Sequence, residues 1–257
     1  MNTYERVLVV MAMRPEAEPV LQSLARHWNI ELPGETALDG RLPMRRWHFE
    51  RPGGGAVDVV INGADPVHGV ESVATQPATL TADAGIRVTD PDLVLTVGTA
   101  GALPEKARIG QVFHVSQYLF HDRRIFGLSP EYENYGVYPI ETTALPARVG
   151  GADVPAAIIS TGNSLNPVAE DFRIMQDYGA AMKEMEGAAV GWVAGLHGKA
   201  FSGVKAVTNV YTRSAMAALG SGRSLQEEAT DFQANFEAAT TALAGHMPVL
   251  LDELLGA

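Results

Sequence analysis

Short runs of aliphatic residues alternate with longer stretches of helical periodicity, and this alternation limits what the chain can fold into more than any other feature. Three such runs, each ending at a small or turn-forming residue, predict buried strands over Val7–Ala12, Val57–Asn62 and Leu93–Val97. Between them, Glu16–Trp28 and Ser72–Ile86 place apolar residues at helical spacing. Strands that alternate with helices are typical of a layered α/β domain.

The second half of the chain continues this pattern. Gly110–Val115 and Ala156–Ser160 predict two further strands, while Met182–Leu196 and Leu225–Leu255 predict helices, the last one broken near Pro248. Since no linker-like or repeated segment interrupts the chain, we expect residues 1–257 to form a single domain.

Two connections have a composition of their own. Phe126–Pro139 contains three tyrosines and two prolines without a clear period, which predicts a long surface loop. Such a loop either carries function or is only a poorly ordered connection. Gly53-Gly54-Gly55 follows Arg51-Pro52 and indicates a hairpin turn. Neither glycine-rich nucleotide-binding motif, the Walker loop or Gly-x-Gly-x-x-Gly, is present.

The charge and cysteine content exclude several classes of function. A net charge of −11 repels phosphate, so we expect no nucleic-acid or anionic membrane partner and a small or neutral ligand instead. The absence of cysteine excludes disulfides, thiolate nucleophiles and cysteine-ligated metals, and is compatible with the cytoplasmic location that we expect. The apolar run Val7–Ala12 is too short for a membrane span and lacks the layout of a signal peptide.

Several motifs follow one another in a fixed order. They are Ala12-Met13-Arg14-Pro15-Glu16, Val97-Gly98-Thr99-Ala100-Gly101, Phe120-His121-Asp122-Arg123-Arg124-Ile125, Ser160-Thr161-Gly162-Asn163-Ser164-Leu165, Lys183-Glu184-Met185-Glu186-Gly187-Ala188-Ala189-Val190 and Lys205-Ala206-Val207-Thr208-Asn209. In this order they resemble the 5'-methylthioadenosine/S-adenosylhomocysteine nucleosidases, above all the plant-type branch, over nearly the whole chain.

The resemblance implies a three-layer αβα fold with a central mixed β-sheet, as in the nucleoside phosphorylase superfamily. It also implies hydrolysis of the N-glycosidic bond of purine nucleosides in methionine salvage, with no cofactor and no metal. Members of this branch are homodimers in which the neighbouring subunit lines the pocket for the 5' substituent. We therefore expect a homodimer with the region Tyr118–Pro139 at its interface.

Two carboxylates are the first candidate catalytic residues. By resemblance, Glu186 accepts hydrogen bonds from the ribose hydroxyls and stabilises positive charge on the ring, whereas spacing alone favours an acid at a helix N-terminus that interacts with the macrodipole. Glu16 matches the residue that deprotonates the attacking water, and otherwise reads as a first-turn acid after Pro15. A carboxylate facing C1' repels phosphate, which favours hydrolysis over phosphorolysis; Arg14 is the counter-indication.

Other residues are candidates for substrate binding. By resemblance, Thr99, Ala100 and Gly101 form a turn under the nucleoside, a pattern that a plain strand-to-helix turn also produces. Leu165 matches the residue on the purine face, near backbone that reads the base edge, although a leucine alone indicates core. The remaining candidates taken from the motifs are Ala12, Asn163, Met185 and Thr208.

Asn209 departs from the family pattern at the position of the aspartate that protonates or hydrogen-bonds the purine. Its amide can still donate one hydrogen bond to adenine and accept another, but it cannot transfer a proton near neutral pH. The general-acid contribution to the rate, about 10²- to 10⁴-fold, should therefore be missing or supplied elsewhere. Three explanations fit: a shift to 6-oxopurine nucleosides, for which trimeric purine nucleoside phosphorylases use asparagine, an aspartate-to-asparagine exchange made to trap substrate, or a homologue that binds nucleosides with little turnover.

Other chemistries have weaker support. His114, His121, Asp122 and Arg123 lack the spacing of a metal site and read more readily as structural pairs. The nucleophile elbow of the α/β-hydrolases is absent, which disfavours serine catalysis.

Overall fold

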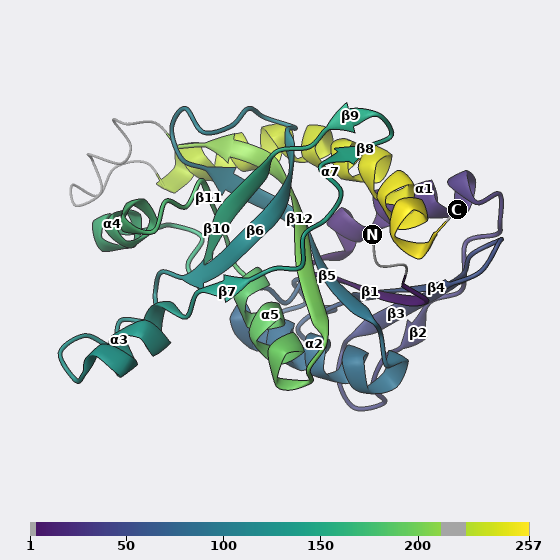
Figure 1. Ribbon diagram of the computed structural model, residues 1–257, viewed down its shortest axis with the longest axis horizontal. Coiled ribbons are helices and arrows are strands. Elements are labelled where there is room, and N and C mark those ends of the chain that lie inside the picture. The colour runs from purple at the N-terminus through teal and green to yellow at the C-terminus, as the bar shows by residue number, and fades with distance from the viewer. Residues whose placement is uncertain (1–3, 212–224, 257) are drawn as a thin grey trace.

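The computed structural model describes residues 4–211 and 225–256, with the backbone alone for 225–231. Ten strands form its central sheet: β1 (Arg6–Met11), β2 (Thr36–Ala37), β3 (Arg45–Glu50), β4 (Ala56–Ile61), β5 (Leu93–Ala102), β6 (Val112–Phe120), β7 (Ile140–Glu141), β10 (Ala156–Thr161), β11 (Met182–Glu184) and β12 (Ala200–Val210). Their order is β11-β10-β6-β12-β5-β1-β4-β3-β2, with β7 beside β6 (Figure 1). The short strands β8 (Arg148–Val149) and β9 (Ala152–Asp153) pair separately.

The sheet closes on itself at one end. β11 pairs in parallel with β10 and also antiparallel with β5, through Met182 opposite Ala102 and Lys183 opposite Gly101. Strands β11, β10, β6, β12 and β5 therefore form a small closed ring, and β1, β4, β3 and β2 extend from β5 as an open sheet. This closure brings β11 beside strands that lie far away in sequence.

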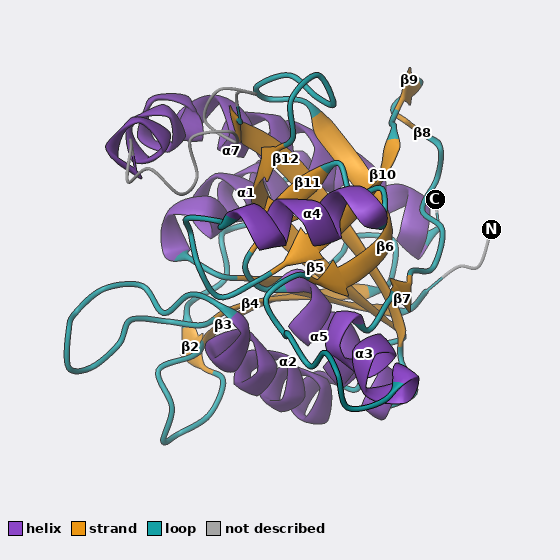
Figure 2. Ribbon diagram, turned by 90° about the vertical axis from the view of Figure 1, so that its left-hand side faces the viewer, coloured by secondary structure: helices purple, strands orange, loops and turns teal. Residues whose placement is uncertain are grey.

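Helices cover both faces of the sheet. The helices are α1 (Arg14–His27), α2 (Thr75–Thr89), α3 (Pro130–Val137), α4 (Ala169–Asp177), α5 (Gly187–Leu196) and α7 (Leu225–Leu255). Figure 2 shows α1 and α7 above the sheet and α2 and α5 below it, so the predicted three-layer α/β architecture with a mixed sheet is confirmed.

Strand β1 shows why the buried strands are apolar along their whole length. Val7 and Val9 pack in the core cluster that includes residues of α1 and α7, whereas Leu8 and Val10 pack in the cluster that includes residues of α2 and α5. A strand covered by helices on both faces needs an apolar residue at every position, which explains the uninterrupted run in the sequence.

Three expectations about secondary structure were wrong. Met182–Leu196 is not one helix, because Met182–Glu184 forms strand β11 and the helix begins at Gly187. The predicted loop Phe126–Pro139 contains α3, which Pro130 opens at a position where its missing N–H costs nothing. The tail is not broken: Pro248 lies inside α7, whose buried side chains pack against the sheet on either side of it.

The expected turn and strands agree with the structure. Gly53-Gly54-Gly55 lies in the connection between the antiparallel strands β3 and β4, and all three glycines have positive φ. Within the described part of the chain, no helix combines the length and hydrophobicity that a membrane crossing requires.

Candidate active site

A cavity of about 250 Å³ opens where β1, β5 and β12 end and α5 begins. In α/β proteins ligands bind at this edge of the sheet. The cavity is lined by Ala12, Met13, Glu16, Val73, Thr99, Ala100, Gly101, Leu165, Lys183, Glu184, Met185, Glu186, Thr208, Asn209, Tyr211 and Phe232. The structure thus brings together every residue predicted for the site except Asn163.

Glu16 lies in the first turn of α1 and is buried. Its Oε1 accepts hydrogen bonds from the Thr99 backbone N–H (2.9 Å) and hydroxyl (2.7 Å) at the end of β5. A side chain at Gly98 would put its Cβ 3.2 Å from the carboxylate, so the glycine permits this close approach. Burial raises the pKa of Glu16 against the opposing effects of Thr99 and Lys205, and a carboxyl with a raised pKa is a stronger general base once ionised.

Glu186 occupies the N-cap position of α5, but its side chain does not cap that helix. Oε1 instead accepts a hydrogen bond from the backbone N–H of Ala74 (2.8 Å), at the start of α2. Burial, followed by the charge of Glu184, raises the pKa of Glu186 to about 7. The carboxyl is therefore held at the cavity wall, poised between its neutral and anionic forms at physiological pH.

Glu184 and Lys205 form a buried ion pair that the sequence analysis did not single out. Lys205 Nζ lies 2.9 Å from Glu184 Oε2, with side chains 3% and 1% exposed. Glu184 also accepts hydrogen bonds from the Thr161 hydroxyl and from the Gly187 N–H. Burial alone would raise the pKa of Glu184, but Lys205 and Thr161 outweigh it and lower the pKa, so the carboxylate stays charged. The available signal was a lysine inside an apolar strand run.

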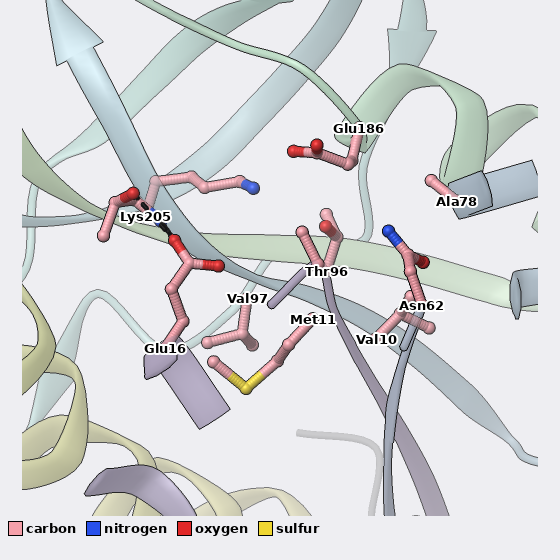
Figure 3. Close-up of a pocket in the computed structure, with 11 residues that line it drawn as sticks. Val10, Met11, Glu16, Asn62, Ala78, Thr96, Val97, Glu186 and Lys205 are labelled. Carbon is pink, nitrogen blue, oxygen red and sulfur yellow. Dashed lines mark hydrogen bonds between the residues drawn. The ribbon is translucent and has the colours of Figure 1, made fainter. Parts of the chain in front are cut away.

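A second, smaller hollow of about 10 Å³ lies between Glu16, Glu186 and Lys205. In Figure 3 the Lys205 ammonium extends into the space between the two carboxylates, with Asn62 and Thr96 nearby. This volume suits about one water molecule, and the polar walls supply hydrogen-bond partners for it. The arrangement therefore has room for one positioned water next to a candidate base.

Asn209 lies on β12 beside Gly101 of β5. The Thr208 hydroxyl lies within hydrogen-bond distance of both Asn209 Oδ1 (3.1 Å) and the Ala100 carbonyl (3.3 Å), and the Asn209 amide NH₂ is a donor that it can present to a ligand. A Cβ at Gly101 would lie 2.9 Å from Asn209 Nδ2 and 3.0 Å from Tyr211, so the glycine leaves space for the amide.

Asn163 is exposed and is not among the residues that line the 250 Å³ cavity. Its Oδ1 accepts hydrogen bonds from the Thr75 hydroxyl (2.6 Å) and N–H (3.1 Å), and its Nδ2 donates to Asp122 (2.9 Å). Asn163 therefore bridges α2 and the segment after β6, and its contact with substrate stays a prediction. Leu165 is 50% exposed and lines the cavity, so it is not a core residue.

The histidines considered as alternatives pair with structural partners. His114 Nε2 lies 2.9 Å from His246 Nε2 of α7, and His121 Nδ1 lies 2.8 Å from the Ser160 hydroxyl. Among the described residues, no three His, Cys, Asp or Glu side chains converge as a metal site requires.

The chain is also similar to known proteins over nearly its whole length. Residues 6–247 match the family described as the Phosphorylase superfamily. The chain is 32% identical to 5'-methylthioadenosine nucleosidase of Arabidopsis thaliana, over 97% of this chain and 87% of that protein. It is 30% identical to 5'-methylthioadenosine/S-adenosylhomocysteine nucleosidase of the same plant, over 97% and 92%. The apo structure of A. thaliana 5'-methylthioadenosine nucleosidase matches with a TM-score of 0.85 at 31% identity, over 100% of this chain and 98% of that one.

Proposed function

This chain belongs to the phosphorylase superfamily and, within it, to the 5'-methylthioadenosine/S-adenosylhomocysteine nucleosidase family, and from this premise we propose that it is a cofactor-independent purine nucleosidase. Its default substrates are 5'-methylthioadenosine and S-adenosylhomocysteine. One observation carries the proposal: Glu16 and Glu186 lie on the wall of the same cavity as Asn209, with a space for one water between the carboxylates.

The proposed reaction breaks the bond between C1' of the ribose and N9 of the purine. The electron pair of that bond leaves with the base, while positive charge develops on the ribose next to the Glu186 carboxylate. Glu16 takes a proton from the water in the small hollow, and the water oxygen forms the new bond to C1'. The base leaves as an anion with its N7 hydrogen-bonded by Asn209 and takes its proton from solvent, because an amide has none to give.

Asn209 keeps two alternatives open. The Asn209 amide NH₂ can donate to N7 or O6 of a 6-oxopurine, so inosine-type nucleosides are the second candidate class. A nucleoside-binding protein with little turnover, by nature or through an introduced exchange, is the third. Phosphorolysis is disfavoured because Glu16, Glu184 and Glu186 line the cavity.

Arg14, the residue that argued for an anionic substrate, does not line the cavity. Its guanidinium pairs with Glu35 at 2.8 Å. The remaining part of the proposal is a cytoplasmic homodimer in methionine salvage, with the region Tyr118–Pro139 at the interface. The exposure of Phe126, Leu128 and Tyr132 in that region supports it, and a monomer in light scattering at micromolar concentration would contradict it.

The deciding experiment measures base release by chromatography from methylthioadenosine, adenosylhomocysteine, adenosine and inosine, with and without phosphate. We expect adenine release that does not depend on phosphate. Release of hypoxanthine alone would instead establish the 6-oxopurine class, and phosphate-dependent release would establish a phosphorylase. Tight binding without release of any base would establish the binding protein.

Variants test the roles of the individual residues. Glu16→Gln should abolish hydrolysis and spare nucleoside binding, whereas Glu18→Gln, an exposed acid on the same helix, should change neither. Asn209→Asp should raise adenine release by about 10²- to 10⁴-fold if the scaffold lacks only its acid. Loss of a 6-oxopurine activity in Asn209→Asp would identify the asparagine as a specificity residue instead.

A further inference from the structure

Lys183 is a buried lysine on the cavity wall that the proposed reaction does not yet use. It lies on β11 with 3% of its surface exposed. Its Nζ donates to the backbone carbonyls of Ser164 (2.6 Å) and Leu165 (3.0 Å). Burying an ammonium is costly unless its donors are satisfied, so this position imposes a specific geometry on both partners.

The strand register places Lys183 at the same end of the cavity as Asn209. Gly101 of β5 pairs with Lys183 of β11 on one side and with Asn209 of β12 on the other. Side chains of paired residues start on the same face of a sheet. Gly101 has no side chain, so it forms an open floor with the amide on one side and the lysine on the other.

The backbone that Lys183 holds belongs to the Ser164–Leu165 segment, which is the segment expected to lie against the purine. Leu165 lines the cavity, and the turn before it is fixed at its other end, where the Asn163 N–H donates to Asp122 (2.6 Å) and the Gly162 N–H donates to the Glu184 carbonyl (3.1 Å). Lys183 supplies hydrogen bonds at the end of this turn that lines the cavity.

A cation in this place has an electrostatic consequence as well. In a site shielded from water, a positive charge acts over a longer range than it does in solution. Departure of a purine creates negative charge on the base, and Asn209 has no acid proton with which to neutralise it. A fixed ammonium at the same end of the cavity stabilises that charge without proton transfer.

We propose that Lys183 is a positioning residue for the leaving base, which fixes the Ser164–Leu165 backbone against the purine and places a positive charge beside it. This inference rests on the proposed nucleosidase function. It assigns to Lys183 part of the leaving-group stabilisation that an aspartate in place of Asn209 would supply.

The test compares two leaving groups in Lys183→Met, with Lys106→Met, an exposed lysine, as the matched control. One substrate is methylthioadenosine, and the other is the p-nitrophenyl glycoside of 5-methylthioribose, whose nitrophenolate leaves without assistance. For Lys183→Met we expect kcat on methylthioadenosine to fall by about 10- to 100-fold and kcat on the nitrophenyl glycoside to fall less than about threefold. Lys183→Arg, which keeps the charge, should recover activity on methylthioadenosine. Equal losses on both substrates, no loss on either, or no recovery in Lys183→Arg would overturn the proposal.

Two further measurements keep this test separate from the proposed function itself. If thermal unfolding shows that Lys183→Met does not fold, Lys183→Gln takes its place, with the same expectation. If the wild-type protein releases no base, the nucleosidase proposal fails, but binding of free 6-chloropurine still tests Lys183, because this base ionises at mildly alkaline pH. Wild-type affinity should then rise with pH over the range in which the base ionises, and that rise should vanish in Lys183→Met; a rise that persists would overturn the inference.

Discussion

Removing the ammonium of Lys205 should destabilise the protein by an amount that grows with pH. In Lys205→Met the Glu184 carboxylate loses the partner that lies 2.9 Å away, while the site stays buried. Breaking one side of a buried pair costs about 3–5 kcal/mol when the remaining charge stays in place. Protonation of the carboxylate limits this cost, because a neutral Glu184 needs no counter-charge.

The free-energy cost of protonating Glu184, which sets this limit, follows from the ordinary pKa of glutamate. Neutralising a carboxyl of pKa about 4.3 costs about 1.4 kcal/mol per pH unit above that value, which gives about 2 kcal/mol at pH 5.5 and about 5 kcal/mol at pH 8. The folded variant holds a proton on Glu184 that the unfolded chain has released, so its stability falls as pH rises through this window. We therefore expect a loss of about 2 kcal/mol at pH 5.5 and about 3–5 kcal/mol at pH 8.

The assay is urea unfolding followed by circular dichroism at both pH values. The double variant Lys205→Met/Glu184→Gln should recover part of the loss at pH 8, because it neutralises the carboxylate that pairs directly with Lys205, while Glu16 and Glu186 still lose the charge of Lys205. Lys199→Met breaks an exposed pair with Asp90 and should change stability much less, and equally at both pH values. A loss in Lys205→Met that is the same at pH 5.5 and pH 8 would refute the electrostatic explanation.

Three further predictions concern other parts of the structure. The value of kcat/KM should rise with pH with an apparent pKa near 7, since neutral Glu186 cannot stabilise a positive ribose; a flat profile from pH 5.5 to 8 would contradict this. Gly101→Ala places a methyl group 2.9 Å from Asn209 Nδ2, so the amide must shift, and KM should rise by roughly tenfold or more; an unchanged KM would contradict this. Asp252→Ala removes hydrogen bonds that α7 accepts from side chains at the end of α1 and the β3–β4 turn, and should cost about 1–3 kcal/mol in urea unfolding.

Periodicity predicted the strands and helices wherever packing follows local sequence. The run that became β1 is apolar at every position because helices cover both of its faces. The same rule failed over Met182–Leu196, where strand and helix are both apolar and only the partners of the strand distinguish them. Pro248 led to the opposite error, since it predicted a break in a helix that is continuous. The tertiary packing of α7 overrides the local preference of a proline.

The candidate site was predictable in its members but not in its connections. The motif order identified Glu16, Glu186 and Asn209, and the cavity is lined by all three. The pairing of Glu184 with Lys205 was not predictable, because it depends on β11 joining the ring of strands that includes β5 and β12, and no local pattern encodes that closure. Asn163 belongs to a motif as well, yet only the structure shows that its side chain accepts a hydrogen bond from Thr75 at the start of α2.

The charges along the cavity follow the charges that the proposed hydrolysis creates. Among the residues that the structure describes at the ribose end, Glu16, Glu184 and Glu186 outnumber the cation Lys205, which suits a sugar that becomes positive as the bond breaks. At the base end, Lys183 flanks the Gly101 floor and suits a purine that becomes negative. An anionic nucleophile such as phosphate would have to enter at the ribose end, where carboxylates already exceed cations. Water is neutral and avoids that repulsion, and a buried carboxylate can make it nucleophilic by taking its proton. The same charge distribution therefore favours both hydrolysis over phosphorolysis and departure of the base as an anion, which is the condition under which an asparagine at position 209 is compatible with turnover.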